Sequence, residues 1–325
     1  MARIGTGRVN DRLVTDPDGV AVLAAQVADT TGLPAAQVEK DFWVTEVLRG
    51  VTRAAKALGV EVVFKGGTSL SKAFGFIERF SEDVDVLVIL PADTTGAKER
   101  VLKALVAGAA AATNVDATTV PTATTKGVKR GARFHYRPSD FTATTGLSDG
   151  VFLEIGSRGG AMPTSTLSIR SLIAEHASNR IGDVPEAARF EVRVLHPART
   201  LVEKLVLLHT ASGDPNPAVL VRGARHYYDV HQLLQRNEVL NEIREVGIAI
   251  LARDVFTYST VAALPAEPRP LEGFASSAAF ISGLHLGLVH ADYDVRVLGT
   301  LLWPRAATPS FDDCLTAVRG LRHVL

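Results

Sequence analysis

The spacing of apolar residues divides the chain into two parts of different character. Up to about residue 195, short apolar runs typical of β-strands alternate with segments whose apolar residues recur at helical spacing. The runs that predict strands are 61–64, 84–90, 115–121, 132–137, 150–156 and 190–195. Helices are expected at 34–58, 68–76 and 95–112. This pattern predicts a mixed sheet flanked by helices.

The rest of the chain reads as helical almost to its end. Leu201, Leu205 and Leu208 fall on one face of the first of these predicted helices. We therefore expect an α+β fold, with an α/β domain over 1–195 and a mainly helical domain over 196–325.

Two aspartates interrupt one of the predicted strands in an alternating pattern. In the stretch Asp83-Val84-Asp85-Val86, alternation places both carboxylates on one face and both valines on the other, toward the core. Carboxylates on one face repel each other, and a divalent cation relieves that repulsion. Mg²⁺ commonly binds one or two carboxylates together with phosphate oxygens. An edge strand with an acidic outer face would have the same spacing, so the pattern alone leaves both interpretations open.

A glycine pair precedes this acidic strand, between a predicted strand and a predicted helix. Gly66 and Gly67 would let the backbone approach a phosphate, and the N–H groups at a helix start favour anions. Thr68 and Ser69 would donate hydroxyl groups there or cap the helix, and Lys65 would contact phosphate or lie in solvent. No G-x-x-x-x-G-K-[ST] or G-x-G-x-x-G motif is present, which excludes a P-loop and a dinucleotide-binding fold.

The order of these features resembles a known signature. A strand, a Gly-Gly pair, a helix and a strand with D-x-D resemble the DNA polymerase β-like nucleotidyltransferase superfamily. The longer string KGGTSLSKAF…ERFSEDVDVLV, within 65–88, is similar to the AbiEii/AbiGii-type toxins, the nucleotidyltransferase half of type IV toxin–antitoxin systems, including mycobacterial members. A looser resemblance covers about 35–235 and leaves the last 90 residues unassigned. It implies a nucleotidyltransferase-like sheet in the first domain.

The resemblance also implies roles for individual residues. Asp83 and Asp85 would bind Mg²⁺ (or Mn²⁺), with Glu154 in VFLEIG as a third carboxylate. Lys204 would hold the triphosphate as a point charge, and Asp229 would orient Lys204 or an arginine. The catalytic set would be Asp83, Asp85, Lys204 and Asp229. Three of these residues also fit ordinary roles: Glu154 as a strand glutamate in a salt bridge, Lys204 as a solvated helix lysine and Asp229 as a surface acid.

Ser81 lies two residues before Asp83, beside the acidic face. The hypothesis here is that Ser81 belongs to the phosphate-binding residues, and that phosphate attached to it would crowd the carboxylates and compete for metal.

A basic run offers a possible contact to RNA. Residues 122–137 contain five cationic residues and no acid, with Phe134, His135 and Tyr136 interleaved. Such a run could grip an RNA backbone and stack a base, or form a solvated hairpin. The cationic residues are Lys126, Lys129, Arg130, Arg133 and Arg137.

Composition narrows the class of protein. Lys plus Arg and Asp plus Glu number 35 each, so net charge signals no bulk attraction to nucleic acid. Cys314 is the one cysteine, which suits a reducing cytoplasm. No secretory signal and no stretch of ~20 apolar residues is present, so we expect a cytoplasmic protein that does not enter a membrane. H-E-x-x-H, Cys/His clusters and G-x-S-x-G are absent, which argues against a zinc site and a serine hydrolase.

The expected function follows from the resemblance. It implies an enzyme that transfers NMP from an NTP to an RNA acceptor, with the 3′ end of tRNA as the expected acceptor and a cognate antitoxin as partner. Added nucleotides would block aminoacylation and stop translation. The same residues would also serve an enzyme that modifies a small molecule or a protein side chain, or a non-catalytic nucleotide-binding protein of this fold.

Overall fold

The chain forms two compact units that do not follow chain order. The computed structural model describes residues 12–90, 94–140, 147–157, 160, 162–261, 265–281, 283 and 285–325. The first unit comprises the described residues within Met1–Phe64, Glu82–Ser157 and Thr166–Arg193. The second comprises those within Lys65–Ser81, Arg158–Ser165 and Val194–Leu325. The segment 65–81 thus groups with the helical part, and the domains expected at 1–195 and 196–325 stay a prediction.

The first unit is built on a mixed sheet. Its strands follow the order β3-β4-β5-β2-β1-β7-β6. β2 pairs in parallel with β5, whereas β4 pairs antiparallel with both β3 and β5. The strands are β1 (Glu61–Lys65), β2 (Asp83–Ile89), β3 (Asp116–Thr125), β4 (Lys129–His135), β5 (Val151–Gly156), β6 (Thr164–Ile169) and β7 (Phe190–Leu195). The mixed sheet predicted from the apolar pattern is therefore present.

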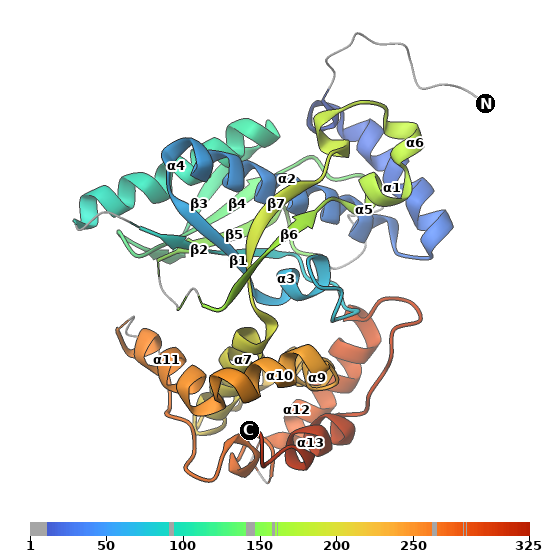
Figure 1. Ribbon diagram of the computed structural model, residues 1–325. Coiled ribbons are helices and arrows are strands. Elements are labelled where there is room, and N and C mark those ends of the chain that lie inside the picture. The colour runs from blue at the N-terminus through green and yellow to red at the C-terminus, as the bar shows by residue number, and fades with distance from the viewer. Residues whose placement is uncertain are drawn as a thin grey trace. The chain divides into compact units, whose positions relative to one another are not determined.

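Helices of the first unit cover the sheet. α2 and α4 pack against each other and against β2–β5 (Figure 1). α2 buries Val38, Phe42 and Val47 at helical spacing and ends at Gly59, whose left-handed φ of 64° closes the helix. The unit contains η1 (Leu13–Thr15), α1 (Pro17–Thr31), α2 (Ala35–Leu58), α4 (Thr95–Thr113), α5 (Leu172–His176), α6 (Ser178–Ile181) and η2 (Pro185–Ala187).

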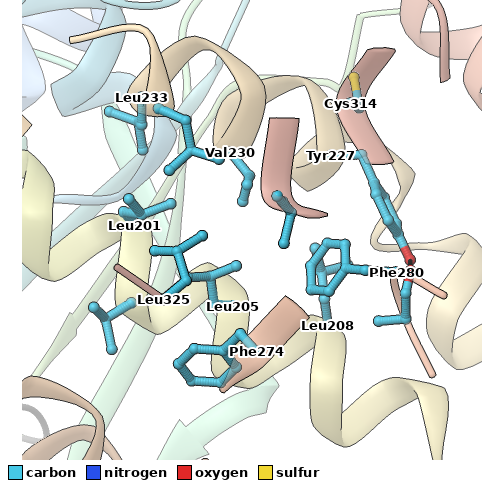
Figure 2. Close-up of a cluster of buried hydrophobic side chains, with 14 of the residues drawn as sticks. Leu201, Leu205, Leu208, Tyr227, Val230, Leu233, Phe274, Phe280, Cys314 and Leu325 are labelled. Atoms are coloured by element: carbon cyan, nitrogen blue, oxygen red, sulfur yellow. Dashed lines mark hydrogen bonds between the residues drawn. The ribbon is translucent and has the colours of Figure 1, made fainter. Parts of the chain in front are cut away.

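The second unit is a set of helices around an apolar core. Leucines of α7 meet α9 there, and Cys314 is buried in the same core, as Figure 2 shows. The helices are α3 (Gly66–Lys72), α7 (Pro197–Ser212), α8 (Pro217–Val221), α9 (Ala224–Leu234), α10 (Asn237–Val246), α11 (Ile248–Val261), η3 (Phe274–Ser276), α12 (Leu286–Asp292), η4 (Tyr293–Leu301) and α13 (Phe311–Gly320). The helical second part is therefore confirmed. Within the described part of the chain, no helix has the length and apolarity to cross a membrane.

The contact between α2 and α4 leaves no space for a side chain at Gly50. A Cβ on Gly50 would lie 2.8 Å from Ala109 Cα and 3.2 Å from Ala112 Cβ. We expect Gly50→Ala to lower the free energy of unfolding by about 1–3 kcal/mol, because the helices must move apart. Chemical denaturation measures this.

Gly96→Ala is the matched control on α4. Among the described residues, a Cβ there would meet only Arg100 Nη1, at 3.9 Å. It should leave stability unchanged or raise it by up to about 1 kcal/mol, because alanine restricts the unfolded chain. Equal losses in the two variants would contradict close packing at Gly50.

Candidate active site

The acidic residues of the first unit lie on one face of β2. Asp83 and Asp85 are half-buried, whereas Val84 and Val86 between and after them are 0% and 3% exposed. The strand therefore has the alternation that the sequence predicts. The aspartates point to the face of the sheet opposite the one that the valines occupy.

A third carboxylate stands beside them in register. β5 runs parallel to β2 and places Glu154 opposite Asp85 and Phe152 opposite Asp83. Neighbouring strands lie about 5 Å apart, so Glu154 extends the acidic row onto the next strand. Its Oε2 accepts a hydrogen bond of 3.1 Å from Lys129 Nζ on β4. Glu154 thus has the salt bridge of its ordinary interpretation while standing next to the D-x-D motif.

The donor set of this face fits a hard divalent cation. Asp83 and Asp85 supply carboxylate oxygens, which Mg²⁺ and Mn²⁺ prefer. No three His, Cys, Asp or Glu side chains of the described residues converge so as to hold a metal ion by themselves. Two carboxylates are enough where water and substrate phosphates complete the coordination. The two carboxylates therefore suit a metal ion whose other coordination positions are filled by water and phosphate oxygens.

The basic run does not form one continuous cationic surface. Alternation along β4 separates Lys129 and Arg133 from Arg130, which is 8% exposed. Arg130 Nη2 forms an ion pair with Glu99 of α4 and its Nη1 donates to Thr119 Oγ1 at 2.8 Å. Arg130 therefore holds α4 to the sheet.

The other cations of the run have separate environments. The Arg133 guanidinium lies 5.5 Å from the centre of the Phe152 ring, on the acidic face. Arg137 pairs with Asp18 of α1, and Lys126 is exposed in the turn before β4. A role of this run in binding RNA stays a prediction.

Gly66 and Gly67, in the second unit, are each required to be glycine for a different structural reason. Gly66 begins α3 with a φ of 81°, a left-handed conformation that favours glycine. At Gly67 a Cβ would lie 2.8 Å from Arg79 Nη2 and 3.0 Å from Ser81 Oγ. The first glycine is required by the backbone and the second by close packing.

Hydroxyl groups next to the glycines hold this turn together. Thr68 Oγ1 donates to Ser81 Oγ at 2.9 Å, and Ser69 Oγ donates to the Gly66 carbonyl at 2.9 Å. Lys65 Nζ lies 3.1 Å from Glu203 Oε2 on α7. The predicted phosphate-binding residues from 65 to 69 are thus joined to Ser81 and to α7 within one unit.

A buried carboxylate organises the remaining predicted residues. Asp229 on α9 is fully buried, and its Oδ2 lies 2.7 Å from Lys204 Nζ on α7. Arg79 Nε and Nη2 donate to the two Asp229 oxygens at 2.6 and 2.8 Å. Lys204 Nζ also donates to His226 Nδ1, at 3.1 Å. Asp229 therefore contacts both the lysine and an arginine. Arg79 is not among the residues predicted for the site, although it lies within the string KGGTSLSKAF…ERFSEDVDVLV, two residues before Ser81.

The charges in this cluster follow from burial and proximity. Burial alone would raise the pKa of Asp229, but Arg79 and Lys204 hold that pKa well below its usual value. Burial lowers the pKa of Lys204, and Asp229 opposes this shift. Burial and the Lys204 charge lower the pKa of His226 to about 3, so the imidazole is neutral. Two cations share one carboxylate, which leaves excess positive charge able to attract an anion.

Comparisons with known proteins agree with the sequence signature. A family model described as the nucleotidyl transferase AbiEii toxin of type IV toxin–antitoxin systems matches residues 48–315. The match extends into the C-terminal segment that the resemblance left unassigned. A search of curated proteins gives no match.

A solved structure shares the fold. The nucleotidyltransferase toxin MenT4 from Mycobacterium tuberculosis H37Rv is similar with a TM-score of 0.59 and 17% sequence identity. The match covers 94% of this chain and 90% of that chain. This likeness concerns the fold, and it confirms a nucleotidyltransferase-like mixed sheet with flanking helices.

Removal of the shared carboxylate should destabilise the second unit. We expect Asp229→Asn to lower the free energy of unfolding by about 3–5 kcal/mol, because Lys204 and Arg79 would remain buried without a counter-charge. Chemical denaturation measures the change. Glu245→Gln, at an exposed position of α10, is the control and should stay within about 0.5 kcal/mol. A similar stability of both variants would contradict the buried network.

Proposed function

The chain belongs to the AbiEii family of nucleotidyltransferase toxins of type IV toxin–antitoxin systems, and we propose that it transfers NMP from an NTP to the 3′ end of tRNA. Membership of the family makes it a transferase with an antitoxin as partner. The NTP, the metal ion and the RNA acceptor are the parts that the proposal adds.

One observation carries the proposal: Asp83 and Asp85 share one face of β2, and Glu154 of β5 stands in register with Asp85. Asp83 and Asp85 would hold Mg²⁺ (or Mn²⁺), with Glu154 beside them. The ion, when bound, neutralises phosphate charge and lowers the pKa of an attacking hydroxyl. The buried valines of the strand keep both carboxylates on the same face, so repulsion between them favours cation binding.

Residues of the second unit would bind phosphate. Lys204 is held by Asp229 at 2.7 Å, so its ammonium group is in place before a nucleotide binds. Since Arg79 shares the same carboxylate, positive charge is left over for a triphosphate. The turn from Lys65 to Ser69 would add backbone N–H groups and hydroxyls, and Ser81 would lie among these phosphate-binding residues.

The proposed acceptor explains toxicity. A nucleotide added to the 3′ end of tRNA blocks aminoacylation and stops translation, and an antitoxin would restrain that activity. NTPs and tRNA are met in the cytoplasm, so we place the reaction there.

The ion pairs formed by the cationic residues of 122–137 favour a second candidate function. Arg130 and Arg137 are bound to carboxylates of their own unit, and so is Lys129. Fewer cations are then available to an RNA backbone, which favours a small molecule or a protein side chain as acceptor. The transfer chemistry would be the same.

A labelling experiment tests the function. Purified protein is incubated with Mg²⁺, total tRNA and each α-labelled NTP in turn. We expect label on tRNA with at least one NTP, lost by more than about 100-fold in Asp83→Ala and Asp85→Ala, because a metal ligand contributes at least as much as its supporting residues. EDTA should abolish labelling and added Mg²⁺ should restore it.

Asp116→Ala, an exposed acid on β3, is the control and should label normally. Label on protein or on a small acceptor in place of tRNA would favour the second candidate. Absence of label on all three would contradict nucleotidyl transfer.

Growth provides an independent test. Expression of the chain without antitoxin should arrest growth, and Asp85→Ala should restore it, because arrest depends on the transfer reaction. Colony counts after induction, with immunoblots to match protein levels, measure this. Arrest by Asp85→Ala at wild-type levels would indicate a non-catalytic binding protein.

A further inference from the structure

A cavity of about 610 Å³ lies within the second unit. Residues of α7, of α8, of the start of α9 and of α11 line it, together with Lys65, Pro265 and residues of the loops that join α7 to α8 and α8 to α9. The volume is in the range of pockets that hold small ligands. Its lining divides into an apolar wall and a cationic part.

The apolar wall leaves large side chains uncovered. Val206, Val219 and Val255 contribute aliphatic surface, and Leu207 and Tyr258 are 46% and 43% exposed. A planar aromatic ligand would cover this wall and stack on the tyrosine ring, as nucleobases do on aromatic side chains.

The cationic part favours an anion. Four of the lining side chains are cationic and two, Glu203 and Asp214, are acidic. The cationic residues are Lys65, Arg199, Arg222 and Arg225.

The arginines of the lining differ in how far a ligand can reach them. Arg199 is 1% exposed and pairs through Nη1 with Asp254, while its Nε lies 3.8 Å from Glu203, too far for a hydrogen bond. The Nε atoms of Arg199 and Arg225 are both buried and find no hydrogen-bond acceptor among the described residues. An atom that water cannot reach is also out of reach of a ligand in the cavity. The arginines that can contact a bound phosphate are therefore Arg222, which is exposed, and Arg225, which is half-buried.

We infer that this cavity binds one nucleotide, with the base against Tyr258 and Val255 and a phosphate on Arg222 and Arg225. The inference rests on the proposed function, which supplies two sources of that chemistry: an NTP and the terminal nucleotide of an RNA. His226 lines the cavity and contacts Lys204, so a nucleotide held here lies close to the proposed phosphate-binding lysine.

A fluorescent reporter tests binding without turnover. In Tyr258→Trp, with Mg²⁺ omitted, each NTP, total tRNA, tRNA shortened at its 3′ end and pyrophosphate are titrated separately. A base stacked on the indole should quench its emission saturably. Quenching by an NTP identifies the substrate nucleotide, and quenching by intact but not shortened tRNA identifies the acceptor end. Pyrophosphate quenching as strong as that of any nucleotide, or no quenching by any probe, would overturn the inference.

Charge variants in the reporter background supply the matched comparison. Arg225→Gln should weaken nucleotide binding by at least about tenfold, because a charge-assisted contact is lost. Arg253→Gln removes a charge from an exposed position of α11 outside the cavity and should not change binding. Equal affinities in the two variants would count against the cavity. Should Arg225→Gln fail to fold, Arg222→Gln, an exposed residue of the same lining, takes its place.

The outcomes separate this inference from the proposed function. Unchanged KM values of Arg225→Gln for NTP and tRNA, with tRNA still labelled, would refute the nucleotide cavity and leave the transferase intact. Saturable quenching by an NTP in a protein that labels no acceptor would support the cavity and refute the transfer reaction.

Discussion

The polar part of the second unit depends on one buried carboxylate. Asp229 is the common partner of Lys204 and Arg79, and burial of those two cations without it would be strongly unfavourable. Three stretches of chain supply these residues: the segment after α3, α7 and α9. The Arg79 guanidinium lies against Gly67, where a side chain would leave it no space. Gly67 and Asp229, 162 positions apart in the sequence, therefore both fix the position of Arg79.

This network explains why the Gly-Gly segment groups with the helical unit. Around Arg79, backbone atoms extend the connection: Phe80 N donates to Leu301 O at 2.8 Å and Trp303 N donates to Glu78 O at 2.9 Å. Glu78 N also donates to the Tyr228 hydroxyl, at 3.3 Å. Contacts between residues more than 140 positions apart leave no periodic mark in the sequence. The apolar pattern therefore predicts the acidic strand and the helix with Lys204, but it cannot predict that segment 65–81 joins the helical part.

The spacing of apolar residues predicts those elements in which each side chain faces either the core or solvent. The alternation in β2 and the leucine stripe of α7 are both visible in the sequence because each residue faces either core or solvent. β6 has the sequence TSTLSI, largely polar with one buried residue, and the apolar pattern does not indicate it. The burial of Arg130 cannot be predicted in this way either. Its charge predicts an exposed side chain, but its ion pair with Glu99 on α4 allows it to be buried. The burial of a charged residue therefore cannot be predicted from its own position in the sequence, because it depends on a partner elsewhere in the chain.

Neutral His226 and cationic Lys204 have different roles in the buried cluster of the second unit. His226 has a pKa of about 3 because burial and the Lys204 charge both oppose its protonation, so it stays neutral over the physiological range. A neutral imidazole accepts from Lys204 and adds no charge, so it holds the lysine without competing for an anion. Positive charge in this cluster then lies on Lys204 and Arg79, the two cations that Asp229 binds. In the nucleotide site that we infer, discrimination between bases would depend on the apolar wall around Tyr258, because the bases carry no net charge and differ in shape.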